Sequence, residues 1–427
     1  MNIRIYNVRI LTMANGFEII TGELWVQGNV ISYVGTDKSA EDISLIVWDR
    51  QIDGKGNLLM PGFKNAHTHS AMTFLRSYAD DLPLWDWLSK QVFPMEAKIN
   101  EEDIYHLSKL AIMEYLTSGM TANFDMYMTP DSIARASIDC GFRTVMVGGM
   151  NDFSQSLEQM EQWYKRWNND NDLISFCLGF HGEYTTSEKR LIGLASLAKQ
   201  YKAPVYTHNS ETYAEVMGCI ERHGKTTTEY LDGLGLYDYG GGGYHCIYLN
   251  DNDIEIFKER KLTVVTNPGS NVKLASGIAP IVKLMNKGIN IAIGTDGPAS
   301  NNCLDMFREM FLTTGLAKLN DMNAAAVGGN DVLYMATVGG AKALGLHHSD
   351  TLEVGKLADL IMIDLHQPNM QPLNNITKNI VYSGSKQNVK MTMVNGKILY
   401  EDGNFFIGTD PEDIYKKANE IIERCKN

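Results

Sequence analysis

Strand-like and helical segments alternate through most of this 427-residue chain, and this alternation limits the folds that it can adopt. Segments such as 102–117 and 187–201 carry apolar residues at the three- and four-residue spacing of helices. Eight apolar runs are typical of strands: one that ends at His67, and those at 122–125, 144–147, 174–180, 204–207, 243–246, 262–266 and 289–294. This count predicts an α/β fold, a (β/α)8 TIM-like barrel. A doubly wound open sheet is the alternative, but it would require a Gly-rich phosphate loop that the chain lacks.

Both ends of the chain differ from the middle. Residues 1–57 consist of β-rich runs (3–6, 8–13, 22–26 and 30–34) broken by Asn-Gly and Gly-Asn turns, and no helix is expected there. Similar runs recur after the middle segment, at 359–364, 389–394 and 397–400. We therefore expect residues 1–57 and 351–427 to form one small composite β-sandwich, with the barrel over 58–350, because a central domain often returns its ends close together. Helical spacing over 410–425 predicts a C-terminal helix.

Charge and composition exclude several classes of partner. The chain has 38 Lys and Arg against 51 Asp and Glu, a net charge of −13, which disfavours nucleic-acid polymers and anionic membrane surfaces. No apolar run reaches the roughly 18 residues of a membrane span, and the N-terminus lacks the apolar segment of a signal peptide. The six cysteines are scattered without a Cys-x-x-Cys pair. We therefore expect reduced thiols in a cytoplasmic protein.

Four potential metal ligands follow predicted barrel strands. His67 and His69 are two residues apart, so on an extended segment both side chains point to the same side. His208 ends the fifth strand and Asp296 follows the eighth. Taken singly, His208 is more typical of a hydrogen-bonded core histidine, and Asp296 of a helix N-cap. Because the carboxyl ends of barrel strands meet at one face, the four together predict a site for one divalent ion, zinc most readily and iron as the alternative.

Four further residues are candidates for the chemistry around that ion. Glu211 lies three residues after His208, where a carboxylate can carry a proton beside a metal-activated water. His245 ends the sixth strand and can donate a hydrogen bond to a developing oxyanion. Glu96 and His181 are candidates for holding a substrate. Each also has a structural interpretation: Glu211 as a surface carboxylate at a helix start, the other three as ordinary structural residues.

Five motifs of this chain resemble those of the metal-dependent amidohydrolase superfamily: Pro61–His69, His208–Thr212, His245-Cys246, Ser270–Gly277 and Gly294–Asn302. Within it, they are most similar to the branch that contains 5′-methylthioadenosine/S-adenosylhomocysteine deaminases and triazine chlorohydrolases. The resemblance covers nearly the whole chain, since Gly355–Leu360 is also similar to the family's return into the sandwich. It is specific for the branch and much less so for the substrate.

The resemblance implies a barrel with a single zinc or iron ion, and it implies roles by position. The metal ligands would be His67, His69, His208 and Asp296. Glu211 would move a proton from the metal-bound water to a ring nitrogen, while His245 and Asp296 orient the hydroxide that displaces ammonia. Glu96 matches a residue that binds the ribose hydroxyls of a nucleoside, and His181 matches a substrate-contacting histidine. A homo-oligomer is also implied.

Two departures from the family pattern bear on the substrate. Members that accept S-adenosylhomocysteine have an arginine in the loop after the third strand, whereas residues 148–160 contain no Arg or Lys. A buried carboxylate without such a partner binds poorly, so this substrate is disfavoured unless Arg143 or another subunit supplies the charge. In place of the usual His-Ala-Pro-Tyr-Thr, this chain has Glu183 in the third position, and a carboxylate there would repel an anionic tail. We therefore predict a neutral adenine-type nucleoside: 5′-methylthioadenosine, 5′-deoxyadenosine or adenosine.

Two other functions stay open. The nearest enzymatic alternative is the hydrolysis of another aminated or chlorinated heterocycle, such as a triazine, a pterin or guanine, although Glu96 favours a ribose. The alternative from another class is a non-catalytic scaffold, which would have lost ligands, whereas all four and Glu211 are present. Trp85 and Trp87 lie in a loop that leads towards Glu96 and could cover the pocket, with core packing as the alternative for each.

Overall fold

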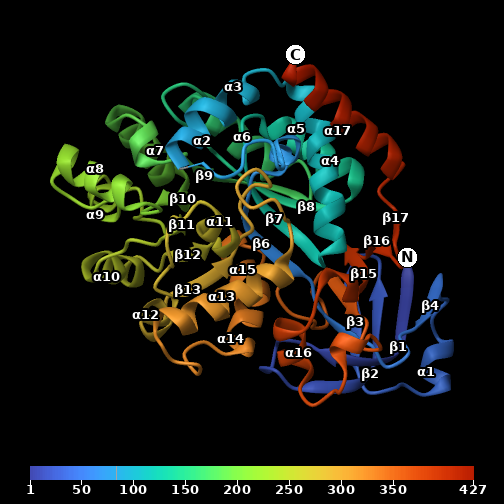
Figure 1. Ribbon diagram of the computed structural model, residues 1–427. Coiled ribbons are helices and arrows are strands. Elements are labelled where there is room, and N and C mark those ends of the chain that lie inside the picture. Colours follow the sequence, from blue (N-terminus) through green and yellow to red (C-terminus); the bar gives the residue numbers. More distant parts are fainter. Residues whose placement is uncertain (83) are drawn as a thin grey trace.

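The centre of the molecule is an eight-stranded parallel barrel, seen in a computed structural model that describes residues 1–82 and 84–427 (Figure 1). The strands are β6 (Phe63–Thr68), β7 (Met120–Met126), β8 (Arg143–Val147), β9 (Ile174–Gly179), β10 (Val205–Asn209), β11 (Gly241–His245), β12 (Thr263–Thr266) and β13 (Asn290–Ile293). Each strand pairs in parallel with the next one in the sequence. The predicted TIM-like barrel is therefore confirmed, and each of the eight predicted runs corresponds to one of these strands.

Helices surround the barrel because each strand is followed by a segment with an apolar face and clear end signals. The helices that follow the barrel strands are α4 (Glu101–Thr117), α5 (Pro130–Cys140), α6 (Leu157–Trp167), α7 (Glu188–Tyr201), α8 (Tyr213–His223), α9 (Thr227–Gly233), α10 (Asp251–Glu259), α11 (Pro268–Lys273), α12 (Ile281–Asn286), α13 (Met306–Asn320), α14 (Gly329–Tyr334) and α15 (Gly340–Leu344). For example, Asn100 caps α4 in a reciprocal arrangement with Asp103. Gly141 ends α5 in the left-handed conformation, with φ of 74°.

The seam between the last strand, β13, and the first, β6, joins residues that are far apart in the sequence. The Asn65 side chain accepts a hydrogen bond from the Thr295 backbone N–H (2.9 Å) and donates one to Thr295 Oγ1 (2.8 Å). One step further, the Asp296 N–H donates to the His67 carbonyl (3.0 Å). A side chain at Gly294 would place its Cβ 2.8 Å from His67 Cβ, so this close approach requires glycine. The seam therefore brings Asp296 beside His67.

The two flanks form a second sheet beside the barrel, with order β17-β16-β15-β14-β5-β1-β2-β3 and β4 paired to β1. Its strands are β1 (Asn2–Leu11), β2 (Ile19–Gln27), β3 (Val30–Gly35), β4 (Arg50–Asp53), β5 (Leu58–Pro61), β14 (Leu360–Ile363), β15 (Val389–Val394), β16 (Lys397–Glu401) and β17 (Asn404–Phe405). The sheet curls around one apolar core, to which β1 and β2 contribute Ile5 and Leu24 and β15 contributes Met391. The Asn29 side chain of the β2–β3 turn reaches Asn395 of the β15–β16 turn. The predicted composite of both chain ends is confirmed, and Figure 1 shows their blue and orange-red elements together.

Two details of the N-terminal flank differ from the prediction. Helix α1 (Ala40–Ser44) occurs where no helix was expected; it is a single turn capped by the Ser39 side chain, too short to produce a periodic pattern. Strand β1 is continuous, although two separate runs were predicted. Asn7 has a φ of 54° within a β-bulge, so the strand bends at this residue and continues pairing with β2.

The C-terminal helix α17 (Pro411–Lys426) begins one residue after its Asp410 N-cap, as the sequence predicted. It packs along α4, where Arg424 forms an ion pair with Asp103. Two further short elements, α2 (Leu84–Trp87) and α3 (Phe93–Glu96), lie above the barrel (Figure 1), and α16 (Ile376–Tyr382) lies beside the flanking sheet.

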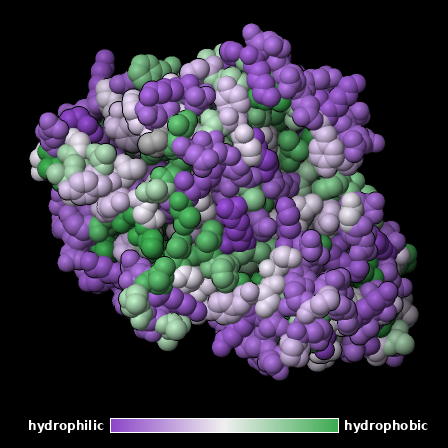
Figure 2. Space-filling view, viewed as in Figure 1, coloured by the Kyte–Doolittle hydropathy of each residue, from purple (hydrophilic) through white to green (hydrophobic). Residues whose placement is uncertain are grey.

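The face of the molecule drawn in Figure 2 is largely hydrophilic, in keeping with the net charge of −13. Figure 2 shows polar side chains over most of this face, with apolar ones gathered near its centre. In residues 1–82 and 84–427, no helix combines the length and the apolar character that crossing a membrane would require.

We expect the buried ion pair between Arg143 and Asp359 to be a major link between barrel and flanking sheet. Arg143 Nε donates to Asp359 Oδ2 (2.6 Å) and Nη2 donates to Oδ1 (3.2 Å), with both side chains almost fully buried. Arg143→Ala should lower the free energy of unfolding by about 3–5 kcal/mol in urea titrations, because it leaves a buried carboxylate unpaired. The more exposed pair of Arg50 and Glu401 provides the control: Arg50→Ala should cost about 0–1 kcal/mol. Equal losses in the two variants would contradict this account.

Candidate active site

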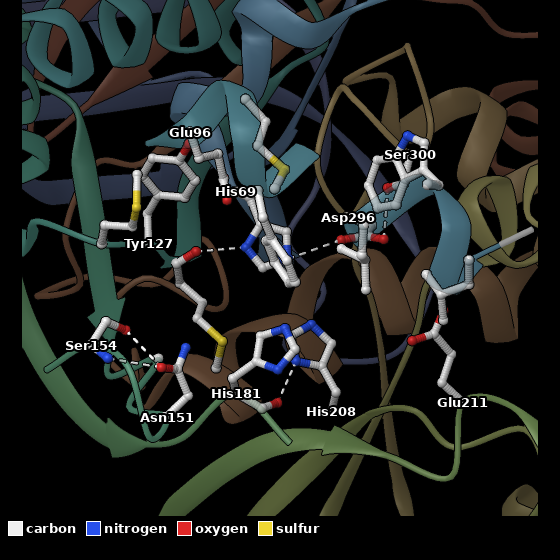
Figure 3. Close-up of a pocket in the computed structure, with 18 of the residues that line it drawn as sticks. His69, Glu96, Tyr127, Asn151, Ser154, His181, His208, Glu211, Asp296 and Ser300 are labelled. Carbon is white, nitrogen blue, oxygen red and sulfur yellow. Dashed lines mark hydrogen bonds and ion pairs between the residues drawn. The ribbon is translucent and has the colours of Figure 1, made fainter. Parts of the chain in front are cut away.

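The carboxyl ends of the barrel strands open into one cavity of about 500 Å³. Of the side chains singled out in the sequence, it is lined by His69, Glu96, His181, His208, Glu211, His245 and Asp296. His67 lies directly behind this wall and is fully buried. Figure 3 shows the labelled members of this set converging from several different elements. Residues that lie up to 229 positions apart in the sequence (67 to 296) therefore surround one space.

Five of these side chains are close enough together to hold a metal ion. They form two groups of three, His67 with His208 and His245, and His67 with His69 and Asp296. In each group the ligand atoms lie within 4.8 Å of one another, and His67 belongs to both. The centroid of the His67 ring lies 4.8 Å from that of His69 and 4.9 Å from that of His208.

Backbone carbonyls orient two of the imidazoles. His69 Nδ1 donates to the Met126 carbonyl (2.5 Å), and His208 Nδ1 donates to the His181 carbonyl (2.6 Å). In each ring the bond holds a proton on Nδ1, so Nε2 is the nitrogen that an ion would bind. His69 Nε2 lies 3.2 Å from Asp296 Oδ1, on the side of the cluster. This arrangement is typical of histidines that bind a metal through Nε2.

His67 provides the test of whether the residues fit a metal ion. Among the described residues, neither of its ring nitrogens has a hydrogen-bond partner, although the ring is completely buried. Burial lowers the pKa of His67 to about 3, so the ring is neutral and offers a lone pair. A buried polar group without a partner costs about 1–3 kcal/mol, which coordination to an ion would offset. The donor set of three imidazoles and one carboxylate therefore fits a divalent ion.

Asp296 is held with one oxygen facing the imidazoles. Its Oδ2 accepts hydrogen bonds from Ser270 Oγ (2.6 Å) and Ser300 Oγ (2.8 Å), while Oδ1 points to His69 and His67. The residue has a φ of 59°, a left-handed conformation that is uncommon outside glycine and clusters at functional sites. The two serines thus leave a single carboxylate oxygen available to a metal ion.

Glu211 is buried next to His245, beside the histidine cluster. Its Oε2 lies 3.9 Å from His245 Nε2, and its Oε1 accepts a hydrogen bond from Ser276 Oγ (3.3 Å). The Glu215 carboxylate accepts hydrogen bonds from the backbone N–H groups of Ser210 and Glu211 (2.8 Å each), which fixes the start of this segment. Burial raises the pKa of Glu211, which makes its carboxyl a better proton acceptor than an exposed one.

His245 is fixed from the opposite side. Its Nδ1 donates to Asn271 Oδ1 (2.7 Å), so Nε2 is directed towards Glu211 and the cluster. Like Asp296, it has a positive φ, 68°. His181 is a neighbour of the cluster rather than a member: its ring lies 4.9 Å from that of His208, and its Nδ1 is hydrogen-bonded to Thr185 Oγ1 (3.0 Å).

A large part of the cavity wall is apolar. This part is formed by Met72, Leu84, Trp87, Leu88, Phe93, Met126, Met128 and Phe153. Glu96 and Tyr127 lie side by side at its upper edge in Figure 3. Among the described residues that line the cavity, none is a lysine or an arginine. A substrate carboxylate would therefore meet no cationic partner here.

Comparison with known proteins gives the family. The amidohydrolase family model matches residues 58–399. The chain belongs to the amidohydrolase family. A 5-methylthioadenosine/S-adenosylhomocysteine deaminase of Thermoanaerobacter pseudethanolicus is 38% identical, covering 100% of this chain and 99% of that protein. A 5′-deoxyadenosine deaminase of Methanosarcina mazei is 36% identical over 100% of both chains.

Solved structures agree with the sequence relatives. The crystal structure of an adenosine deaminase from Xanthomonas campestris with bound zinc has a TM-score of 0.94 and 32% identity, and covers 99% of this chain and 98% of that one. An atrazine chlorohydrolase from Arthrobacter aurescens, at 20% identity and a TM-score of 0.89 over 98% and 100% of the chains, shows the shared fold. The predicted family and enzyme class are confirmed: this amidohydrolase is a metal-dependent hydrolytic deaminase.

Arg143 and Glu183, which bear on the substrate, lie away from this cavity. Arg143 is paired with Asp359 at the barrel's amino end and cannot reach a substrate. Glu183 lines an adjoining cavity, where it is buried and pairs with Arg222 and His223. Its charge is therefore compensated within this amidohydrolase, so the expected repulsion of an anionic tail does not come from Glu183.

The two tryptophans of the 80–90 segment have different surroundings. Trp87 is 5% exposed and forms part of the main cavity wall, whereas Trp85 is 61% exposed and lies at the adjoining cavity. The helical turn α2 carries both, so the segment does border the pocket at Trp87.

Several residues around the site were not singled out in the sequence: Ser270, Asn271, Ser276, Ser300, Glu215 and Tyr127. Ser270, Asn271 and Ser276 lie in one of the motifs that carry the family resemblance, and Ser300 lies in another. That position in a motif is the signal that could have identified them. Tyr127 follows β7 in no such motif, and only its place in the cavity reveals it.

Metal content tests the cluster directly. We expect about one zinc or iron ion per chain in the purified protein by elemental analysis. His67→Ala removes the side chain shared by both groups and should weaken metal binding by more than the about 10- to 100-fold typical of outer-sphere changes. His223→Ala is the control, because His223 binds Glu183 away from the cluster. A His67→Ala protein that keeps wild-type metal content would refute the proposed site.

Proposed function

We propose that this amidohydrolase hydrolyses the exocyclic amino group of an adenine-type nucleoside with an uncharged 5′ substituent: 5′-deoxyadenosine, 5′-methylthioadenosine or adenosine. Water adds at the amino-bearing ring carbon and the C–N bond breaks, giving the inosine analogue and ammonia. The observation that carries the proposal is the cavity itself. It has a metal-fitting cluster at its base, a carboxylate (Glu96) at its edge, and a lining without lysine or arginine.

The relatives support the same substrate class. Proteins 36% to 38% identical over their full lengths are named 5′-deoxyadenosine deaminase and 5-methylthioadenosine/S-adenosylhomocysteine deaminase. We disfavour S-adenosylhomocysteine for this chain, because a charged carboxylate in the cavity would lose its hydration without gaining a guanidinium partner. A neutral 5′ group would instead bury its apolar surface against Met72, Phe93 and Met128.

Each polar residue has a role in this reaction. The proposed ligands are His67, His69, His208 and Asp296, and a divalent ion bound there would supply an activated water as nucleophile. Glu211 accepts the proton of the attacking water and delivers it to the ring nitrogen next to the reacting carbon. His245 Nε2, directed towards the same point, accepts a hydrogen bond from the attacking water and so orients it, because Nδ1 carries the ring proton that Asn271 accepts. His181 contacts the bound base from beside His208.

Zinc is the ion that we propose. Three imidazoles and one carboxylate form a set that zinc favours, and the adenosine deaminase of Xanthomonas campestris was solved with bound zinc. Iron remains the alternative, because its ligand preferences overlap. A homo-oligomer is also part of the proposal and rests on the family resemblance alone.

A screen of ammonia release would test the substrate class. The metal-loaded protein should release ammonia from 5′-deoxyadenosine, 5′-methylthioadenosine and adenosine, and much more slowly from S-adenosylhomocysteine, guanine, pterins and aminated triazines. Rapid turnover of a triazine or guanine with no reaction of the nucleosides would overturn the proposal in favour of the alternative heterocycle hydrolase. Absence of activity on the whole panel would favour a non-catalytic scaffold.

The role of Glu211 predicts a loss of turnover without a loss of metal. Glu211→Gln preserves the size of the side chain but removes its ability to accept a proton, so kcat should fall by about two orders of magnitude or more. Elemental analysis should still find wild-type metal content, because Glu211 is not among the proposed ligands. Glu221→Gln, a change on the outer part of α8, is the matched control and should leave kcat unaltered. Unchanged turnover in Glu211→Gln would remove this residue from the mechanism.

The role of Glu96 predicts an effect that depends on the sugar. Glu96→Ala should raise KM for nucleosides by about 10- to 100-fold, because a charged acceptor for ribose hydroxyls is lost, but should change KM for free aminated bases little. Equal effects on both substrates would contradict the ribose role.

The pH dependence provides a second measurement of the same role. Burial raises the pKa of Glu96 to about 7, against a smaller lowering from the neighbouring Tyr127 hydroxyl. The carboxylate is therefore protonated as the pH falls through 7, and KM for nucleosides should rise over this range while KM for free bases does not.

A further inference from the structure

Tyr127 places an unused hydroxyl group at the edge of the cavity. It follows β7 directly, and its side chain is 6% exposed. Among residues 1–82 and 84–427, its buried Oη makes no hydrogen bond of ordinary geometry, and the neighbouring Glu96 carboxyl is a polar group that acts on it. Leaving a buried hydroxyl unpaired costs about 1–3 kcal/mol, so such a group is expected to find a partner when the site is filled.

Two amide side chains that line the same cavity are engaged with backbone groups rather than with this hydroxyl. The Gln155 amide is engaged within the protein: its Nε2 donates to the Tyr127 carbonyl (2.9 Å) and its Oε1 accepts from the Gly149 N–H (2.9 Å). Asn151 Oδ1 similarly accepts from the backbone of Ser154 (2.8 Å). The bond from Gln155 also holds the Tyr127 backbone in place. Tyr127 is thus a rigidly held donor whose hydroxyl remains available to a ligand.

Glu96 is the group with which Tyr127 can share a ligand. The two side chains lie next to each other in Figure 3 and line the same cavity, although they come from α3 and from the end of β7. An ionised carboxylate only accepts hydrogen bonds, whereas a phenol can donate one. Together they offer two acceptor oxygens and one donor within a small region. That pattern complements a vicinal diol, in which each hydroxyl donates one hydrogen bond and accepts others.

We propose that Tyr127 is a specificity residue that donates a hydrogen bond to the oxygen of one ribose hydroxyl, while Glu96 accepts the protons of both. This inference rests on the proposed nucleoside function and adds a residue to the sugar-binding region. Tyr127 touches the sugar and takes no part in the proton transfers at the ring. Its loss therefore acts on binding and KM, and kcat stays close to the wild-type value.

Binding measurements separate this contact from a merely structural role. Glu211→Gln, loaded with zinc, serves as a background that binds nucleosides without rapid turnover. In this background protein, calorimetry would measure the affinities for 5′-deoxyadenosine and for its 2′-deoxy and 3′-deoxy analogues, with and without the further change Tyr127→Phe. We expect Tyr127→Phe to weaken binding of 5′-deoxyadenosine about tenfold, the effect of one lost hydrogen bond to a sugar hydroxyl. It should leave unchanged the binding of the analogue that lacks the contacted hydroxyl.

A matched control removes another tyrosine hydroxyl that lies beside a glutamate. Tyr201 donates to Glu161 (2.6 Å) on the outer helices, and Tyr201→Phe should leave all three affinities unaltered. Equal weakening of all three ligands by Tyr127→Phe, or no weakening of any, would overturn the assignment of Tyr127. If the background protein binds none of the three ligands and the wild-type protein releases no ammonia from them, the proposed function fails instead.

Discussion

The closure of the barrel is the constraint on which the site depends. Asn65 bridges to Thr295, and the Asp296 N–H donates to the His67 carbonyl, so the segment that follows the last strand is bonded to the first strand beside two proposed metal ligands. Gly294 permits that approach because any side chain there would collide with His67. The contacts that close the fold therefore also assemble the cluster, and disturbing this seam would change stability and metal binding together.

Hydrogen bonds to the atoms of His69, His208 and Asp296 that face away from the cluster orient these proposed ligands. Backbone carbonyls hold the Nδ1 protons of His69 and His208, and two serines occupy one oxygen of Asp296. His67 has no such partner among the described residues, and coordination to an ion would satisfy one of its two nitrogens. The positive φ of Asp296 is a cost that these surrounding bonds offset.

Substrate selection depends on the residues that line the cavity apart from the metal cluster. A large part of the cavity wall is apolar, with Glu96 as a carboxylate and without a cation in its lining. The two charged groups that the sequence suggested for substrate selection are paired elsewhere: Glu183 pairs with Arg222, and Arg143 pairs with Asp359 on the other side of the barrel. This separation would allow a reaction shared by the family to be combined with the proposed preference for uncharged nucleosides.

The sequence by itself determined the order of elements and the chemistry of the ligands. Alternating apolar periodicities predicted the eight strands, and the position of His67, His69, His208 and Asp296 after them predicted one shared site, because parallel barrel strands end on one face. Only the tertiary structure decided which side chains face the outer cavity. The pairing of Glu183 with Arg222 joins the loop after β9 to α8, and the place of Tyr127 beside Glu96 joins β7 to α3. Such contacts depend on how separate elements pack against one another, which local periodicity does not encode.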